Sequence, residues 1–213
     1  APASAQGMSP GDPAKDAYTL PGGFEPVLQL RTYYLDQESL TGSPSAAWAL
    51  GGWAGLRSPW WGDLFQVGVV GYTSQKLYGP AGKGGTLILQ SDQSSIYVLG
   101  EAWGAVRVAG QTIAGYRQLI DRAFINPQDT REIPNTFEAY TLTGAYGPLS
   151  YTGDYMTKMK TRASEDFLWA SQVAGGTGPH KGVIYAGATY AFAGTGYVKV
   201  DEFMRTGAPN LYA

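Results

Sequence analysis

Side-chain character alternates with period two along most of this chain, and that alternation constrains the fold more than any other feature. It recurs in nine segments of about strand length, separated by stretches rich in Gly, Pro, Asn, Asp and Ser. No segment holds the ~18 uninterrupted apolar residues of a membrane helix. We therefore expect an all-β protein with about nine strands. The alternating segments are 28–34, 46–57, 65–72, 96–108, 111–117, 137–142, 149–158, 183–191 and 197–203.

The two faces of these segments differ in a way that is unusual for a soluble sheet. One face carries bulky apolar side chains, whereas the other is rich in Gly, Ala, Gln, Glu and Arg. A β-sandwich would fill its inner face with large aliphatic residues, so a small or polar second face favours a membrane barrel. In 96–108, we expect Ile96, Val98, Ala102, Val106 and Val108 on the lipid face, and Tyr97, Glu101, Trp103 and Arg107 on the lumen face.

The connections between the segments alternate in length. Stretches 74–95, 119–135 and 159–181 are long, whereas 109–110 and 193–196 are tight turns. Outer-membrane barrels have long external loops and short periplasmic turns. The sequence therefore predicts an antiparallel transmembrane β-barrel in the bacterial outer membrane, with residues 1–26 as a loose tail and 27–213 as the barrel segment.

Composition and motifs exclude several other functions. The net charge is -2, with no basic stripe for nucleic acid. Charged residues make up 15%, against ~25% in soluble domains. There is no cysteine, and His180 is the only histidine, so we expect no metal and no cofactor. The sequence around Lys83 lacks the spacing of a phosphate-binding loop, and no catalytic triad can be assembled, so we expect no enzymatic activity.

The basic residues are the best candidates for a functional site. Arg31, Arg107, Arg117 and Lys158 fall on the polar side of their segments, which in a closed barrel faces the lumen. Tyr33 and Glu101 share that side, and we expect all six to line the pore. Arg57 also has lumen parity, but its place near a strand end favours contact with water or lipid headgroups.

Two stretches resemble the OprD family of substrate-specific outer-membrane porins. Leu30-Arg31-Thr32-Tyr33-Tyr34-Leu35-Asp36-Gln37 is similar to the first strand of that family. The stretch from Gly115-Tyr116-Arg117-Gln118 through Ile125-Asn126-Pro127-Gln128-Asp129 to Pro134-Asn135-Thr136-Phe137-Glu138 is similar to its fifth strand, third loop and sixth strand.

The resemblance implies an eighteen-stranded barrel, narrowed by inward-folded loops, in which a ladder of basic residues guides carboxylate-bearing solutes. On this resemblance Arg117 matches a basic wall residue, and Asp129 and Arg131 match the inward-folded third loop. Nine strands are half of eighteen, so we expect the N-terminal half of such a barrel.

The resulting hypothesis is a porin for passive, selective diffusion of small polar solutes. We expect carboxylate-bearing solutes and outer-membrane lipids as its partners, and a homo-oligomer is one compatible assembly. Two alternatives stay open from the sequence. One is a structural membrane barrel with a blocked lumen. The other is a soluble β-sandwich that binds carbohydrate through its tryptophans, namely Trp48, Trp53, Trp60, Trp61 and Trp103.

Overall fold

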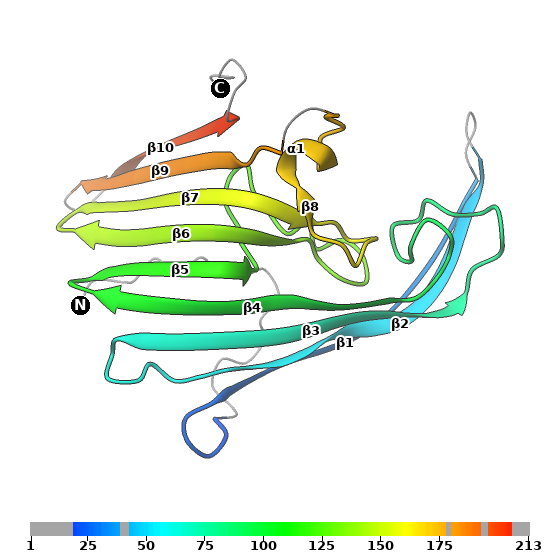
Figure 1. Cartoon of the computed structure of the whole chain (residues 1–213), viewed down its shortest axis with the longest axis horizontal. Coiled ribbons are helices and arrows are strands. Elements are labelled where there is room, and N and C mark those ends of the chain that lie inside the picture. The colour runs from blue at the N-terminus through cyan, green and yellow to red at the C-terminus, as the bar shows by residue number, and fades with distance from the viewer. Residues whose placement is uncertain (1–18, 39–42, 178–179, 193–195, 206–213) are drawn as a thin grey trace.

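The strands form one antiparallel sheet in which nearly every strand pairs with its neighbour in the chain (Figure 1). The structure, a computed structural model, describes residues 19–38, 43–177, 180–192 and 196–205. The sheet order is β1-β2-β3-β4-β5-β6-β7-β9-β10, and the short β8 pairs with the C-terminal end of β7. The elements are β1 (Glu25–Gln37), β2 (Ser45–Arg57), β3 (Phe65–Tyr78), β4 (Ile96–Val108), β5 (Gln111–Gln118), β6 (Thr136–Tyr146), β7 (Leu149–Lys160), β8 (Leu168–Trp169), α1 (Ala170–Val173), β9 (Val183–Phe192) and β10 (Gly196–Arg205).

This arrangement confirms the all-β barrel prediction and all nine predicted strands, to which the structure adds β8. The described strands belong to a single sheet, so the β-sandwich alternative is wrong. The first strand begins at Glu25, two residues before the predicted boundary, and Leu20 pairs with Phe24 just ahead of it. The rest of the predicted tail, residues 1–18, lies outside the described part of the chain.

Short turns and long loops gather at opposite ends of the sheet (Figure 1). The β4–β5 connection is the two-residue turn Ala109-Gly110, with φ of 49° and 77°. Positive φ at both positions is the type I′ geometry whose twist suits a tight hairpin. Among the described residues, no helix is long and apolar enough to cross a membrane.

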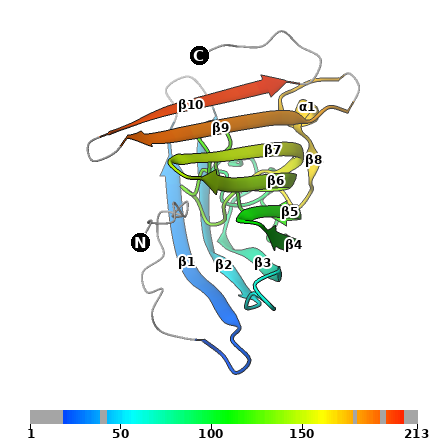
Figure 2. The ribbon, with the colours of Figure 1, turned by 90° about the vertical axis from the view of Figure 1, so that its left-hand side faces the viewer.

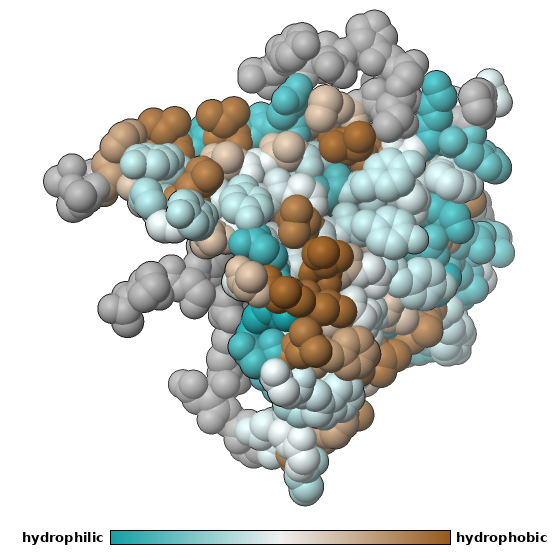
Figure 3. Space-filling view, turned by 60° about the vertical axis from the view of Figure 1, so that its left-hand side comes forward, coloured by the Kyte–Doolittle hydropathy of each residue, from teal (hydrophilic) through white to brown (hydrophobic). Residues whose placement is uncertain are grey.

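The two faces of the sheet carry different side chains, and the strands curve around the inner of the two (Figure 2). The outer face exposes large apolar residues, and Leu28 and Leu30 are 79% and 77% exposed. Hydrophobic side chains stand at the surface in the space-filling view of Figure 3. Because exposed apolar area of this kind is costly in water, the outer face is suited to lipid.

The expected faces are wrong for the first half of β4. Leu99 pairs with Gly71 and Glu101 with Val70, so Gly100 is an extra residue in β4. This bulge reverses the alternation before it: Ile96 is fully buried on the inner face, with Val98 packed nearby, and Tyr97 is 63% exposed. From Glu101 to Val108, the predicted faces agree with the structure. A Cβ atom at Gly100 would lie 2.3 Å from the Tyr72 ring, so only glycine fits the bulge.

Neighbouring positions on β6 test the assignment of the faces. Leu142 lies on the outer face, and Thr143, which is also exposed, lies on the inner face. We expect Leu142→Arg to destabilise the inserted protein by ~2–4 kcal/mol, because arginine on the lipid face is costly near the midplane. Thr143→Arg is the matched control and should be tolerated. Urea titration of protein folded into lipid vesicles measures both, and equal effects would refute the assignment.

Candidate functional site: a loop held across the inner face

Residues 119–135, which join β5 to β6 and are called the inner loop from here on, cross the inner face of the sheet. Near its start, the loop packs Ile120 and Ile125 against Phe137, Met156 and Tyr185 of β6, β7 and β9. Near its end, Ile133 packs into a cluster with Val70, Tyr72 and Ile96 of β3 and β4. The loop therefore spans several strands and narrows the space that the sheet encloses.

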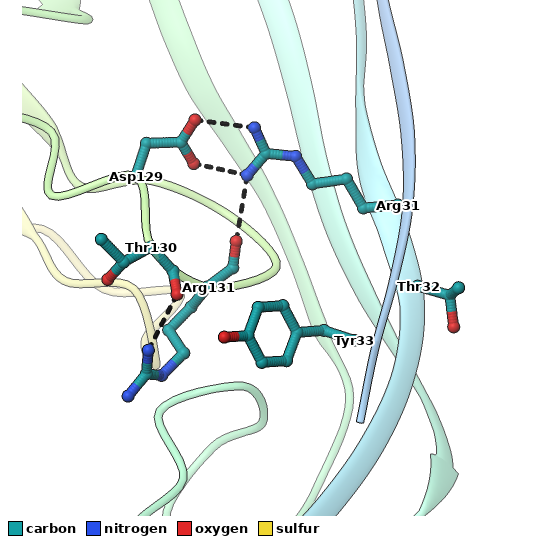
Figure 4. Close-up of a pocket in the computed structure, with 6 residues that line it drawn as sticks. All are labelled: Arg31, Thr32, Tyr33, Asp129, Thr130 and Arg131. Atoms are coloured by element: carbon teal, nitrogen blue, oxygen red, sulfur yellow. Dashed lines mark hydrogen bonds and ion pairs between the residues drawn. The ribbon is translucent and has the colours of Figure 1, made fainter. Parts of the chain in front are cut away.

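The middle of the inner loop is fastened to β1 by a charged pair. Arg31 donates hydrogen bonds to the two carboxylate oxygens of Asp129, at 2.5 Å and 2.7 Å (Figure 4). Its Nη1 also donates to the backbone carbonyl of Arg131, at 3.0 Å. The guanidinium lies 4.4 Å from the centre of the Trp53 ring. A planar fork that grips both oxygens of a carboxylate is geometrically specific, so this contact fixes where the loop tip lies.

An open pocket of about 460 Å³ lies between β1 and the loop tip. Tyr33 and Arg131 point toward each other across it, with the guanidinium 5.9 Å from the ring centre, whereas Thr32 points away (Figure 4). Arg131 donates to the carbonyl of Thr86, at 3.0 Å, and so joins the loop tip to the β3–β4 connection. The sequence-predicted residues Arg31, Tyr33, Asp129 and Arg131 are therefore brought together in one place.

Positive charge exceeds negative charge around this pocket. Arg162 donates to the carbonyl of Gln128, at 3.3 Å, and to the hydroxyl of Thr130, at 2.5 Å. Burial and, second, the like charge of Arg131 lower the pKa of Arg162 from its ordinary value. Arg31 and Arg131 thus line the pocket together with the carboxylate of Asp129, and Arg162 adds a third guanidinium beside the neighbouring loop residues Gln128 and Thr130. The arrangement is suited to attracting an anion.

Arg57 is an inner-face residue that the sequence analysis assigned to water or headgroups. It shares the face of Trp53, and its Nη2 lies 4.0 Å from Glu101. Glu101 also accepts from Tyr72, at 2.6 Å, and from Trp103, at 3.3 Å. Since Glu101 is 2% exposed, it serves as a buried acceptor in the wall, and the expectation that it lines the open pore is corrected.

Arg117 and Lys158 also need correction, because the structure places them in a closed ion-pair cluster away from the pocket. Arg117 pairs in register with Ala102 and Glu138, and Lys158 pairs with Glu138 from the other side. All three therefore have the parity of Ile113 and Tyr140, which are 59% and 65% exposed on the outer face, so the predicted lumen orientation of Arg117 and Lys158 is wrong. Its Nε lies 3.2 Å from Glu138, its Nη1 donates to the Leu99 carbonyl, and the Phe167 ring lies 4.1 Å away. Lys158 is 3.1 Å from the same carboxylate. The cluster fills the wall where β5 ends, and its charge is partly neutralised there.

Arg107, which was expected to line the pore, is not among the residues that line the pocket. Arg107 stacks on Trp60, at 3.9 Å, and pairs with Asp63 at the short-turn end. Arg122 of the inner loop pairs with Asp154 of β7, with Nε to Oδ2 at 2.8 Å. Sequence reasoning missed this second anchor, since alternation carries no signal within a loop. Among the described residues, no group of three His, Asp or Glu side chains is close enough to hold a metal ion.

Comparison with known proteins finds similarity in structure and none in sequence. No protein-family model and no curated protein sequence matches the chain. Acinetobacter baumannii OccAB2 superposes with a TM-score of 0.71 at 17% identity, covering 83% of this chain and 47% of that one. A BenF-like porin from Pseudomonas fluorescens Pf-5 gives a TM-score of 0.67 at 17% identity, covering 82% and 46%.

Two similar structures were solved with small carboxylates. Pseudomonas aeruginosa OpdK with vanillate has a TM-score of 0.66 at 19% identity, covering 82% of this chain and 47% of that one. Pseudomonas aeruginosa OccK2 (OpdF) with glucuronate has a TM-score of 0.62 at 16% identity, covering 82% and 44%.

The chain has the β-barrel fold of outer-membrane porins, of which it spans about half the length. Within that class, the structures that it matches are OprD/Occ-type porins, which confirms at the level of fold the resemblance seen in the sequence.

Proposed function

We propose that this chain belongs to a substrate-selective porin of the bacterial outer membrane, which lets small carboxylate-bearing solutes diffuse down their gradient. The observation that carries the proposal is the inner loop, held across the inner face of the sheet, with the guanidiniums of Arg31 and Arg131 in the pocket at its tip and that of Arg162 beside Thr130. The vanillate and glucuronate of similar structures favour the same solute class.

The transport mechanism needs no covalent chemistry. Positive charge at the loop tip attracts a carboxylate, and the Tyr33 ring offers an apolar contact for the remainder of the solute. Binding must stay weak, because a tightly held solute would not leave the pore. In the same proposal, further strands join the outer edges of β1 and β10, since open edges in lipid would leave backbone groups unpaired. Association into homo-oligomers remains a prediction.

Channel selectivity tests the proposed function. We expect Arg131→Gln to lower the anion preference measured as a reversal potential across a planar bilayer, because a permanent charge beside the pocket is removed. Arg117→Gln removes the same charge from the wall cluster and is the matched control. It should leave selectivity close to that of the wild type. The proposal fails if the wild-type pore shows no anion preference, or if both variants lower it equally.

A further inference from the structure

The inner loop carries a buried carboxyl group that its anchors do not use. Glu132 is completely buried, and the Gly51 amide faces its carboxyl group without forming a hydrogen bond of normal geometry; no other described residue donates to either oxygen. The residues on both sides are fixed, since Arg131 bonds to Thr86 and Ile133 packs against β3 and β4. The carboxyl group therefore cannot turn toward water while the loop keeps this position. We call the loop seated when it occupies this position, and released when it has left it.

The surroundings of Glu132 suit a neutral carboxyl group better than a charged one. From β1, the one charge that faces it is Arg31, which is already committed to Asp129; from β2 the Gly51 amide faces it. The ionisable groups of β3, β4 and β7 near this end of the loop are engaged elsewhere. Tyr72 bonds to Glu101, and Lys160 bonds to the Pro134 carbonyl. A buried ionised carboxylate without hydrogen bonds is strongly disfavoured.

The position of Glu132 couples its protonation to the shape of the pore. It lies three residues from Asp129, which Arg31 holds, and next to Arg131, which lines the pocket. To expose the Glu132 carboxylate to water, residues 129–132 would have to move away from β2. That movement would strain the contact between Arg31 and Asp129 and the contact between Arg131 and Thr86. Because the loop tip borders the pocket, its displacement would change the width of the lumen.

We propose that Glu132 is a proton-operated latch, which keeps the inner loop seated when protonated and releases it when ionised. The inference rests on the proposed function only for its effect on transport, because the movement of the loop does not require that the barrel conducts.

The direction of the pH dependence follows from the two states. Burial, opposed by Arg31 and the Gly51 amide, raises the pKa of Glu132 in the seated loop to about 7, from an ordinary value of 4.5. In a released loop the carboxyl would titrate near the ordinary value. The seated state therefore holds its proton more tightly, so seating is most stable in acid and weakens as pH rises from 4.5 to about 7. The ratio of released to seated loop should rise about tenfold per pH unit across this window.

Spin labelling tests the latch without requiring a conducting channel. The chain has no cysteine, so Thr130→Cys provides a unique attachment site at the loop tip. In folded protein in lipid vesicles, we expect the label to become more mobile between pH 5 and pH 8. Glu132→Gln should remove that change, because its side chain cannot ionise. Asp121→Asn is the matched control, since it neutralises an exposed carboxylate of the same loop and should leave the change intact.

Each outcome decides the proposal. Loss of the pH response in Glu132→Gln, together with its retention in Asp121→Asn, supports the latch. No response in the wild type, or an undiminished response in Glu132→Gln, overturns it. If the label responds as expected while the protein forms no anion-preferring channel, the proposed function fails and the latch stands.

Discussion

Replacement of Arg31 by alanine should free the tip of the inner loop, widen the pore and weaken its preference for carboxylates. The guanidinium makes three hydrogen bonds to the loop, two of them to Asp129. Hydrogen bonds to charged groups contribute about 1.5–3 kcal/mol, and this pair is only about one-fifth exposed, so solvent screens it less than a surface pair. Conductance should rise because the loop tip is freed, and selectivity should fall because one of the two guanidiniums that line the pocket is lost.

A double-mutant cycle with Asp129→Ala separates the pair from the other contacts of each residue. We expect a coupling energy of about 1.5–3 kcal/mol, measured by hydrogen exchange of residues 119–135 in the folded protein. The control is a second cycle, which combines Asp63→Ala with Arg107→Ala. Because Asp63 is 78% exposed in this pair, the coupling energy of the control cycle should be below about 1 kcal/mol. A coupling energy near zero for Arg31 and Asp129 would show that the loop is held by its apolar contacts instead.

Most of the fold could be predicted because the side-chain period of a strand is two and one face must suit lipid. That rule assigns Leu28, Leu30 and Arg31 to the observed faces. It fails at Ile96 and Tyr97 because one extra residue, Gly100, reverses the phase, and alternation on either side of a bulge looks regular in sequence. The glycine at position 100 was the only local sign of the bulge. Its meaning could not be read from the sequence, because it depends on a contact with the Tyr72 ring of the neighbouring strand.

The site was predictable where a residue lies in a long regular strand or in a loop whose sequence resembles the third loop of the OprD family. Arg31, Asp129 and Arg131 meet as expected. Arg117 does not join them, because its register places it on the outer face with Ile113, which is 59% exposed. There it contacts Glu138 and the Leu99 carbonyl, near the point where β5 ends at Gln118. The length of a strand depends on where the following loop turns inward. That turn is set by long-range packing, such as that of Ile120 and Ile125, which periodicity does not encode.

The second anchor of the inner loop should have the larger effect on stability. The Asp154 side chain is fully buried on β7, and Arg122 donates to it from the loop, with Nε at 2.8 Å and Nη2 at 3.5 Å. Arg122→Ala leaves a carboxylate in the wall without its cation. Breaking a buried pair in this way costs about 3–5 kcal/mol, because the remaining charge stays desolvated.

The double variant Arg122→Met/Asp154→Leu distinguishes this cost from a general weakening of the loop. Replacing both charges by apolar side chains removes the stranded carboxylate, so the double variant should unfold in urea at a higher concentration than Arg122→Ala alone. The loop should still be seated in it, because Ile120 and Ile125 continue to pack against Phe137 and Tyr185. If the double variant is less stable than Arg122→Ala, the pair contributes specific attraction beyond neutralising Asp154, and the assigned cause of the single variant's instability is wrong.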